Sequence, residues 1–146
     1  MRLRPCQTTD VPALTALYAH HVRHGTGTFE LEPPSEAEMA GRLADIVGKG
    51  LPWLVAEDDT GLLGYAFANH FRPRRAYRFC VEDSVYLAPS ATGRGIGRLL
   101  LAELVARCEA LGARQMVAVI GDSQNTGSIA LHRALGFKQS GVLEAV

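Results

Sequence analysis

The sequence predicts one domain with an α/β sandwich fold and a partly antiparallel sheet. Three observations lead to this prediction. The chain has 146 residues with 47% hydrophobic content, which is enough for one substantial core and too short to favour two domains. Helical and strand patterns are mixed along the chain, and two strands are joined by a tight turn. No repeat, low-complexity stretch or linker divides residues 1–146.

The N-terminal part is predicted to hold one strand and two helices. The strand starts at Arg2 to Arg4, and the first helix starts near Val11 with Thr9 or Asp10 as its cap. The apolar stripe that this helix is expected to bury is Leu14, Leu17, Tyr18 and Val22.

The second helix follows a pair of prolines. Ser35 and Glu38 form a capping-box pattern, which marks a helix N-terminus. Glycines at positions 48 and 50 end the helix, and its inner face is expected to be Met39, Leu43, Ile46 and Val47.

Three strands are predicted in the middle of the chain. Trp53–Glu57 and Leu62–Phe71 are joined by the turn Asp58–Gly61, so they should pair antiparallel. A basic loop leads to the next strand, Tyr77–Leu87. Pro89 ends that strand because proline cannot donate a main-chain hydrogen bond.

The C-terminal part alternates helices and strands. From Ile96 apolar residues recur at the three- and four-residue spacing of one helical face, namely Leu99, Leu100, Leu104, Val105, Cys108 and Leu111. The apolar run Met116–Ile120 is typical of a strand covered on both faces. A helix at Asn125–Leu135 and a strand at Phe137–Leu143 are expected to follow.

A glycine-rich turn joins the third of the middle strands to the helix that starts at Ile96. Gly93, Gly95 and Gly97 lack side chains, so main-chain N–H groups can converge on an anion at the positive end of the helix dipole. The spacing differs from the glycine patterns of dinucleotide-binding and nucleoside-triphosphate loops. The turn therefore predicts a phosphate site, although a helix start without any ligand gives the same pattern.

Composition narrows the classes of partner. Lys plus Arg and Asp plus Glu are balanced at 15 each, so no excess of positive charge favours nucleic acid. No apolar run approaches the roughly 20 residues that cross a bilayer, and no signal peptide is evident, so a cytoplasmic protein without membrane contact is expected. Cys6, Cys80 and Cys108 are widely spaced and are expected to be structural thiols.

Two segments together resemble the acetyl-CoA signature of the GNAT N-acetyltransferases. They are Arg94-Gly95-Ile96-Gly97 before an amphipathic helix, and the run from Asn125 to Phe137. Nearly the whole chain also resembles the phosphinothricin and methionine sulfoximine acetyltransferase branch, through Gly27–Glu30, Arg72–Tyr77 and Val81–Tyr86. The resemblance implies a GNAT fold, with a central, mixed, mostly antiparallel sheet flanked by helices. It also implies direct transfer of acetyl from acetyl-CoA to the primary amine of a small amino-acid-like substrate.

The resemblance implies where acetyl-CoA binds. The main chain of Val85 and Leu87 would pair with the pantetheine arm, and a distorted strand near Tyr86 would supply N–H donors to the thioester oxygen. The thiol end would be lined by Asn125 and Ser128. The pyrophosphate would be held by the amides of Gly93, Arg94, Gly95, Ile96, Gly97 and Arg98. Thr92, in the same loop, departs from the family, which usually has Gln or Arg there.

Two residues are candidates for proton transfer. An amine arrives as an ammonium, so a carboxylate is needed to accept its proton. Strand alternation places Glu82 on one face with Ser84 and Tyr86, and the matching family position is the base, whereas Asp83 is a competing acid on the apolar side. His132 lies where many GNAT members have a tyrosine that protonates the leaving thiolate. A solvated carboxylate and an ordinary helical histidine are the alternatives.

The substrate side is expected around a basic loop. Arg72 and Arg74, with Tyr77, could clamp a substrate carboxylate because a guanidinium matches a carboxylate in two-point contact. A solvated loop is the alternative. The resemblance adds Phe29, which would pack against the substrate, and its neighbour Glu30.

Other functions and states remain open at this point. A peptide or protein N-terminal acetyltransferase and a non-catalytic acyl-CoA-binding sensor are the alternative functions. No metal is expected. His20, His21 and His24 include a one-turn pair able to bind a metal ion, but no third ligand is evident. Family members usually continue past a stretch like Phe137–Val146 with another strand. The final strand is therefore expected to be missing here, and a homodimer is expected to cover the open edge.

Overall fold

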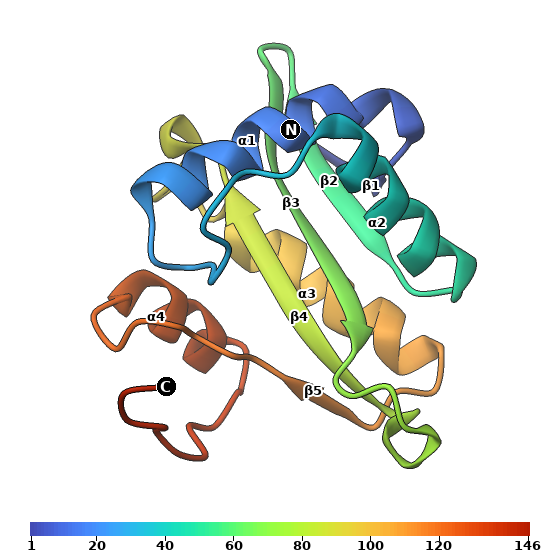
Figure 1. The fold of residues 1–146 in the computed structure, drawn as a ribbon, viewed down its shortest axis with the longest axis vertical. Coiled ribbons are helices and arrows are strands. Elements are labelled where there is room, and N and C mark those ends of the chain that lie inside the picture. The colour runs from blue at the N-terminus through green and yellow to red at the C-terminus, as the bar shows by residue number, and fades with distance from the viewer.

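The protein, seen in a computed structural model that describes residues 1–146, is built on one five-stranded sheet (Figure 1). The strands lie side by side in their order along the chain. Neighbours pair antiparallel except the last two, which are parallel. The strands are β1 Arg2–Pro5, β2 Trp53–Asp58, β3 Gly61–His70, β4 Cys80–Leu87 and β5 Gln115–Val117.

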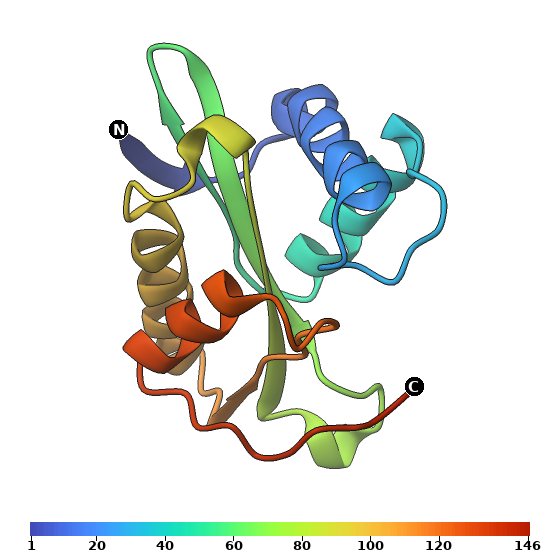
Figure 2. The same cartoon turned by 90° about the vertical axis from the view of Figure 1, so that its left-hand side faces the viewer.

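Helices cover both faces of the sheet (Figure 2). The helices α1 (Val11–His24) and α2 (Glu36–Gly48) lie on one face, and α3 (Ile96–Ala110) and α4 (Thr126–Ala134) lie on the other. Short 3-10 turns join these elements, namely η1 Thr8–Asp10, η2 Arg75–Tyr77 and η3 Pro89–Ala91. The arrangement confirms the predicted fold class, a mixed, mostly antiparallel sheet between helices.

The two faces of the sheet are packed differently. Under α3 the core is aliphatic and includes Leu100 and Leu104, which are fully buried. Under α1 and α2 it is aromatic, and the Trp53 ring stacks on Phe67 with the ring centroids 4.3 Å apart. Each face thus removes a separate set of apolar side chains from water, which is the main stabilising contribution in a sandwich of this size.

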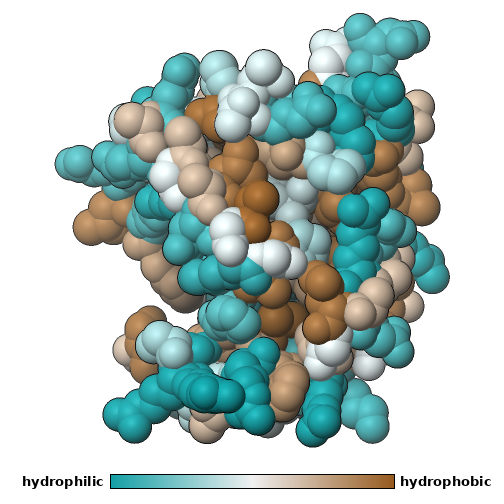
Figure 3. All heavy atoms as spheres, turned by 90° about the vertical axis from the view of Figure 1, so that its right-hand side faces the viewer, coloured by the Kyte–Doolittle hydropathy of each residue, from teal (hydrophilic) through white to brown (hydrophobic).

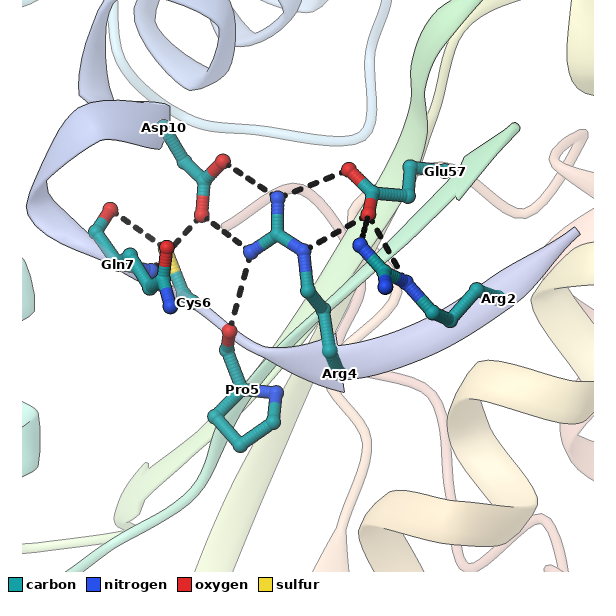
Figure 4. A network of polar contacts seen from close by, with 7 residues as sticks. All are labelled: Arg2, Arg4, Pro5, Cys6, Gln7, Asp10 and Glu57. Carbon is teal, nitrogen blue, oxygen red and sulfur yellow. Dashed lines mark hydrogen bonds and ion pairs between the residues drawn. The ribbon is translucent and has the colours of Figure 1, made fainter. Parts of the chain in front are cut away.

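An arginine fastens the N-terminal strand to its neighbours (Figure 4). The Arg4 guanidinium donates to both carboxylate oxygens of Asp10, at 2.8 Å each, and to both of Glu57, at 2.9 Å each. Its hydrogen bonds lower the pKa of Glu57 to about 2. Asp10 is the residue before α1, but its carboxylate binds Arg4 and the Gln7 amide, so it does not cap that helix as predicted.

All four predicted helices form with nearly the predicted bounds, but three residues that were predicted to be buried are exposed. Ser35 caps α2 by accepting from the Glu38 amide at 3.1 Å. The expected inner residue Val47 is 54% exposed. Leu99 of α3 and Leu111, directly after it, are also exposed, and Leu101 is buried instead. The cause is that the α3 residues facing the sheet are Leu100, Leu101, Leu104 and Cys108, a narrower stripe than the sequence pattern suggested.

Three strand predictions need correction. β4 starts at Cys80 and not at Tyr77, because Arg75–Tyr77 forms the turn η2. β5 is limited to Gln115–Val117 and is not covered on both faces, since Gln115 is exposed and the other two residues are only partly buried. The expected strand at Phe137–Leu143 does not form, because no strand of the sheet pairs with this segment.

The surface is mainly hydrophilic on the side of the molecule where α2 and the end of α3 meet (Figure 3). Apolar residues form a broken band between the polar ones in this view. A cavity of about 330 Å³ at the ends of these helices is lined in part by Leu51, Val81 and Leu111. None of the helices combines the length and the apolar character that crossing a bilayer requires.

Candidate functional site

The C-terminal half of β4 has one free edge. β3 pairs with β4 from Val81 to Leu87, whereas β5 pairs only with Cys80, Val81 and Glu82. Main-chain groups alternate between the two edges of a strand. Because Cys80 and Ala88 bond to β3 and its extension, the groups of Asp83, Val85 and Leu87 point to the side that has no strand. Val85 and Leu87 are the residues that were expected to pair with a pantetheine arm.

The register along this part of β4 is regular. Tyr86 lies opposite Tyr65, and the pairing runs without a shift from Val81 to Leu87. The distortion expected near Tyr86 is therefore absent. The N–H donors of the free edge come from strand alternation and do not need a bulge.

The glycine-rich turn follows directly after this edge. Gly93 and Gly95 have φ of +75° and +79°, a conformation that side chains rarely adopt, and a Cβ at either position would meet nothing within 4 Å. The first helical hydrogen bond of α3 runs from the Leu99 amide to the Gly95 carbonyl at 3.2 Å. The amides from Gly93 to Arg98 precede it and donate to no group of the protein. The turn is therefore an open row of donors at a helix N-terminus, as an anion site requires.

Side chains of the turn point elsewhere. The Thr92 hydroxyl, expected at the coenzyme, donates its proton to the Pro89 carbonyl oxygen at 2.9 Å and so closes η3. Arg94 forms an ion pair with Asp58 at 3.6 Å. Gly97 faces Leu87 and Leu131, and a Cβ there would lie 3.4 Å and 3.5 Å from their methyl groups. The start of α3 is thereby packed against both the end of β4 and α4.

A buried polar pair links β4 to α4. His132 Nε2 lies 2.8 Å from Asp83 Oδ2, and its Nδ1 lies 2.7 Å from the Ser128 carbonyl oxygen. A carboxylate oxygen and a main-chain carbonyl oxygen both accept hydrogen bonds, so this geometry fits an imidazolium with a proton on each ring nitrogen. Burial alone would lower the pKa of His132, but the hydrogen bond and charge of Asp83 raise it. Each of the two residues is 7% exposed.

The N-terminal end of α4 holds Asn125 and Ser128, the two residues expected at the thiol end of coenzyme A. Asn125 Oδ1 accepts from the Ser128 amide at 3.1 Å and so caps α4. The Ser128 hydroxyl lies 3.5 Å from His132 Nδ1. Asn125 and Ser128 are brought together, and the capping explains one part of their sequence pattern.

Glu82 lies on the opposite face of β4 from Asp83. Its side chain is half-buried and makes no hydrogen bond or ion pair within the protein. Burial raises the pKa of Glu82, the positive charge of Arg72 lowers it, and the negative charge of Asp83 raises it, with a net rise. A free carboxylate with a raised pKa is suited to accept a proton near neutral pH.

The family follows from comparison with known proteins. The Acetyltransferase (GNAT) family matches residues 14–137 of the chain. The chain belongs to the GNAT acetyltransferase family. It is therefore an acetyltransferase, with the fold that the resemblance implied.

Individual GNAT relatives are similar over nearly the whole chain. The phosphinothricin N-acetyltransferase of Alcaligenes faecalis is 57% identical over 99% of this chain and 73% of its own. The L-methionine sulfoximine/L-methionine sulfone acetyltransferase of Pseudomonas aeruginosa is 37% identical over 99% of this chain and 84% of its own. A phosphinothricin acetyltransferase from Sinorhizobium meliloti, solved in complex with AcCoA, has a TM-score of 0.93 at 55% identity, and the match covers 96% of this chain and 76% of that one.

In this GNAT chain the residues expected at the substrate lie in two loops. Phe29 is 69% exposed, and Glu30 beside it forms an ion pair with Arg42 of α2 at 2.7 Å. Arg72 and Arg74 are exposed on the loop after β3, and the Arg72 guanidinium lies 4.0 Å above the Phe71 ring.

Tyr77 also belongs to the loop after β3. Its ring packs edge-on against Phe71 and it is 42% exposed. The positive charge of Arg72 in this loop lowers the pKa of Glu82 against the larger effect of burial.

Sequence reasoning missed three contacts around this site. His21 Nε2 lies 2.8 Å from the Leu87 carbonyl oxygen, at the free edge of β4. The Thr26 hydroxyl donates to Asp122 at 2.7 Å, and Gly121 touches the Phe29 ring. Of these residues only His21 could have been found from the sequence, because it lies three residues after Tyr18 and therefore on the buried side of the first helix. His20 and His24 have their rings 5.0 Å apart, and no group of three possible metal ligands forms.

Proposed function

We propose that this GNAT enzyme transfers an acetyl group from acetyl-CoA to the primary amine of a small amino-acid-like molecule of the phosphinothricin or methionine sulfoximine type. One observation carries the proposal, namely two neighbouring sets of unpartnered main-chain donors, one at the free edge of β4 and the other in the turn Gly93–Arg98 at the start of α3. The names of the relatives at 57% and 37% identity support the substrate class.

The groups of this chain fit coenzyme A at both of its ends. The open turn Gly93–Arg98 provides amides and a helix dipole for the pyrophosphate, and glycine leaves the space in which phosphate oxygens need to approach. Val85 and the Leu87 amide provide unpaired strand-edge groups for the pantetheine arm, whereas the Leu87 carbonyl oxygen is already bound to His21. When bound, the thioester supplies an activated acetyl group.

Glu82 is proposed as the general base. It accepts a proton from the substrate ammonium, directly or through one water, and leaves a neutral amine. The net rise in its pKa and its lack of an internal partner support this role. Main-chain N–H groups at the free edge of β4 are proposed to stabilise the negative charge that develops on the carbonyl oxygen.

The proposed role of His132 changes with its geometry. Both ring nitrogens are already bound, and the residue is almost fully buried, so protonation of a thiolate would require breaking a buried hydrogen bond. The geometry favours His132 as a positioning residue that holds α4, with Ser128 and Asn125, against β4. Its imidazolium charge also counters the negative charge of Asp83 beside the free edge.

The substrate is proposed to bind between the loop after α1 and the loop after β3. Arg72 and Arg74 would pair with its carboxylate, Tyr77 would lie beside them, and Phe29 would pack on its side chain. Glu30 would act indirectly, because its carboxylate is paired with Arg42.

Two further expectations stay proposals. A homodimer would cover the outer edge of β5 and exposed apolar residues of the C-terminal part such as Val119 and Leu143. Sizing of the protein in solution tests this, and a monomer at all concentrations would count against it. A cytoplasmic location is proposed from the composition alone.

The experiment that tests the function follows release of free thiol from acetyl-CoA. Methionine sulfoximine, phosphinothricin, a polyamine and a short peptide are compared as acceptors. We expect turnover with the two amino-acid analogues at lower KM than with the peptide. Calorimetry with acetyl-CoA alone measures the coenzyme site separately, and no binding there would overturn the proposal.

A further inference from the structure

The segment Thr26–Glu30, between α1 and α2, is fastened to the helices on one side. The Thr28 hydroxyl shares a 2.6 Å hydrogen bond with Tyr18 of α1, and Glu30 is paired with Arg42 of α2. We call this segment the strap.

The strap is also fastened to the other wall of the site. The Thr26 hydroxyl donates to Asp122 Oδ2 at 2.7 Å, and this bond lowers the pKa of Asp122, which also accepts from the Gln124 amide. The Phe29 ring rests on Gly121. A Cβ at position 121 would lie 2.9 Å from Phe29 Cζ and 3.2 Å from the Thr26 carbonyl oxygen, so only glycine leaves room for the ring in this position.

These contacts join segments that are far apart in sequence. Gly121 and Asp122 lie between β5 and α4, and both ribbon views place the loop after α1 beside this segment (Figures 1 and 2). The free edge of β4 begins where β5 stops, and the strap is bonded to α1 through Thr28 and to the segment after β5 through Thr26. Tyr86 of β4 lies close to the strap, since its ring is 5.1 Å from that of Tyr18, which binds Thr28.

We propose that Gly121 and the Thr26–Asp122 hydrogen bond are positioning elements that fix Phe29 at the amine site. This rests on the proposed function, because it assigns the exposed side of Phe29 to the substrate. The ring is 69% exposed, so few contacts within the protein restrict it, and Gly121 provides one of them. An aromatic side chain that is held before the substrate arrives loses less conformational entropy on binding.

The proposal predicts a selective effect on the amine. In Thr26→Val the side chain keeps its shape but cannot donate to Asp122. KM for methionine sulfoximine should rise about three- to tenfold, the range expected for the net contribution of one ordinary hydrogen bond, because this bond is exposed to solvent. KM for acetyl-CoA should stay within about twofold, because the bond involves no residue of the glycine turn. Thr26→Ser should restore the parent value, and Thr9→Val, at an exposed threonine without a side-chain hydrogen bond, is the matched control.

A double-mutant cycle tests whether Thr26 and Asp122 act together. Thr26→Val and Asp122→Ala should each raise KM for the amine. The double variant should raise it by less than the product of the two single effects, because both changes remove the same hydrogen bond. Gly121→Ala should displace the ring and raise the same KM, whereas Gly41→Ala, where a Cβ meets nothing within 4 Å, should not. Equal rises in both KM values, or independent effects of the two side chains, would overturn the positioning role.

Hydrogen exchange separates this inference from the proposed function. Amides of the strap should exchange faster in Thr26→Val and Gly121→Ala than in the parent protein, while those of β3 and β4 remain unchanged. Unchanged exchange in the strap would show that these contacts do not hold it. If the parent protein releases no thiol with any amine, the proposed function fails and Phe29 loses its assigned ligand, even where the exchange data show a fastened strap.

Discussion

Two neighbouring carboxylates of β4 face opposite sides of the sheet and have different environments. Glu82 points to the side of α1 and α2, is half-buried and has no partner within the protein. Asp83 points to the side of α3 and α4, is 7% exposed and is paired with the His132 imidazolium. One residue step along a strand thus separates an unpaired acid from an acid bound in an ion pair.

The difference shows how one strand separates reactivity from structural support. A carboxylate that has no internal partner and a raised pKa is available for proton transfer. A buried carboxylate in an ion pair is not available for proton transfer, because its charge is already bound. Removing it would leave the partner charge unpaired in a buried environment, which lowers stability. We therefore expect changes at Glu82 to alter the rate and changes at Asp83 to alter stability.

The largest expected effect is that of Glu82→Gln. The amide has the same shape but cannot accept the ammonium proton, so kcat at pH 7 should fall about 10²- to 10⁴-fold, the usual contribution of a general base. In the parent enzyme kcat/KM should rise with pH through a pKa above the ordinary glutamate value of about 4.3. Thiol release across a pH series measures both.

Stability is the control for Glu82→Gln. Its free energy of unfolding should stay within about 0.5 kcal/mol of the parent value, because no internal bond is lost. A variant with full activity at neutral pH would remove Glu82 as the base and would weaken the contrast between the two faces.

Asp83→Ala should have the next largest effect, on stability. The change leaves the buried His132 charge without its partner, which typically costs about 3–5 kcal/mol. Asp83→Asn, which can still form a hydrogen bond to a neutral His132, should cost less. Urea unfolding measures both variants, and a loss for Asp83→Ala no larger than the roughly 1 kcal/mol of an exposed ion pair would show that the buried pair contributes little.

Much of the fold could be predicted from the sequence. The Asp58–Gly61 turn and the apolar spacing after Ile96 are local signals, so β2, β3 and α3 were placed within a few residues. The ends of strands that depend on pairing with a neighbouring strand could not be predicted in this way. The apolar run Met116–Ile120 is longer than β5 because pairing with β4 stops at Val117, and Phe137–Leu143 has the composition of a strand but no strand to pair with.

In the site too, features with a local sequence signal could be predicted, and features that depend on distant segments could not. Gly93 to Arg98 carry their own conformational signal, and the structure shows the open turn that they indicate. Glu82 and Asp83 could be assigned to opposite faces by alternation alone. The link between Asp83 and His132 depends on how α4 docks, and that between Thr26 and Asp122 depends on two loops 96 residues apart, which no local pattern records.

A pH series tests the charge on the Asp83 side. The pKa of His132 is raised in the folded protein, so its contribution to stability is fully present below the unfolded pKa of about 6.5 and is lost as pH rises through the folded pKa. The free energy of unfolding of the parent protein should therefore decline over this window by more than that of His132→Gln. His24→Gln, at an exposed histidine, should behave like the parent, and parallel curves for all three would contradict an imidazolium at position 132.

The smallest expected effect concerns the charge that faces Glu82. Arg72 lowers the pKa of Glu82 against the larger effect of burial, so Arg72→Gln should shift the acid limb of the kcat/KM profile to higher pH. The shift is modest because Arg72 is exposed and its field is screened by salt. KM for methionine sulfoximine should rise as well, if the guanidinium also binds the substrate carboxylate.

Ionic strength separates the two roles of Arg72. Salt should reduce the difference in acid limb between parent and Arg72→Gln, whereas a two-point contact with the substrate should persist better at high salt. Arg75→Gln, at an exposed arginine of the same loop, is the matched control and should alter neither value. An acid limb that does not move in Arg72→Gln would mean that burial alone sets the pKa of Glu82, and the contrast with Asp83 would then rest on desolvation and not on charge.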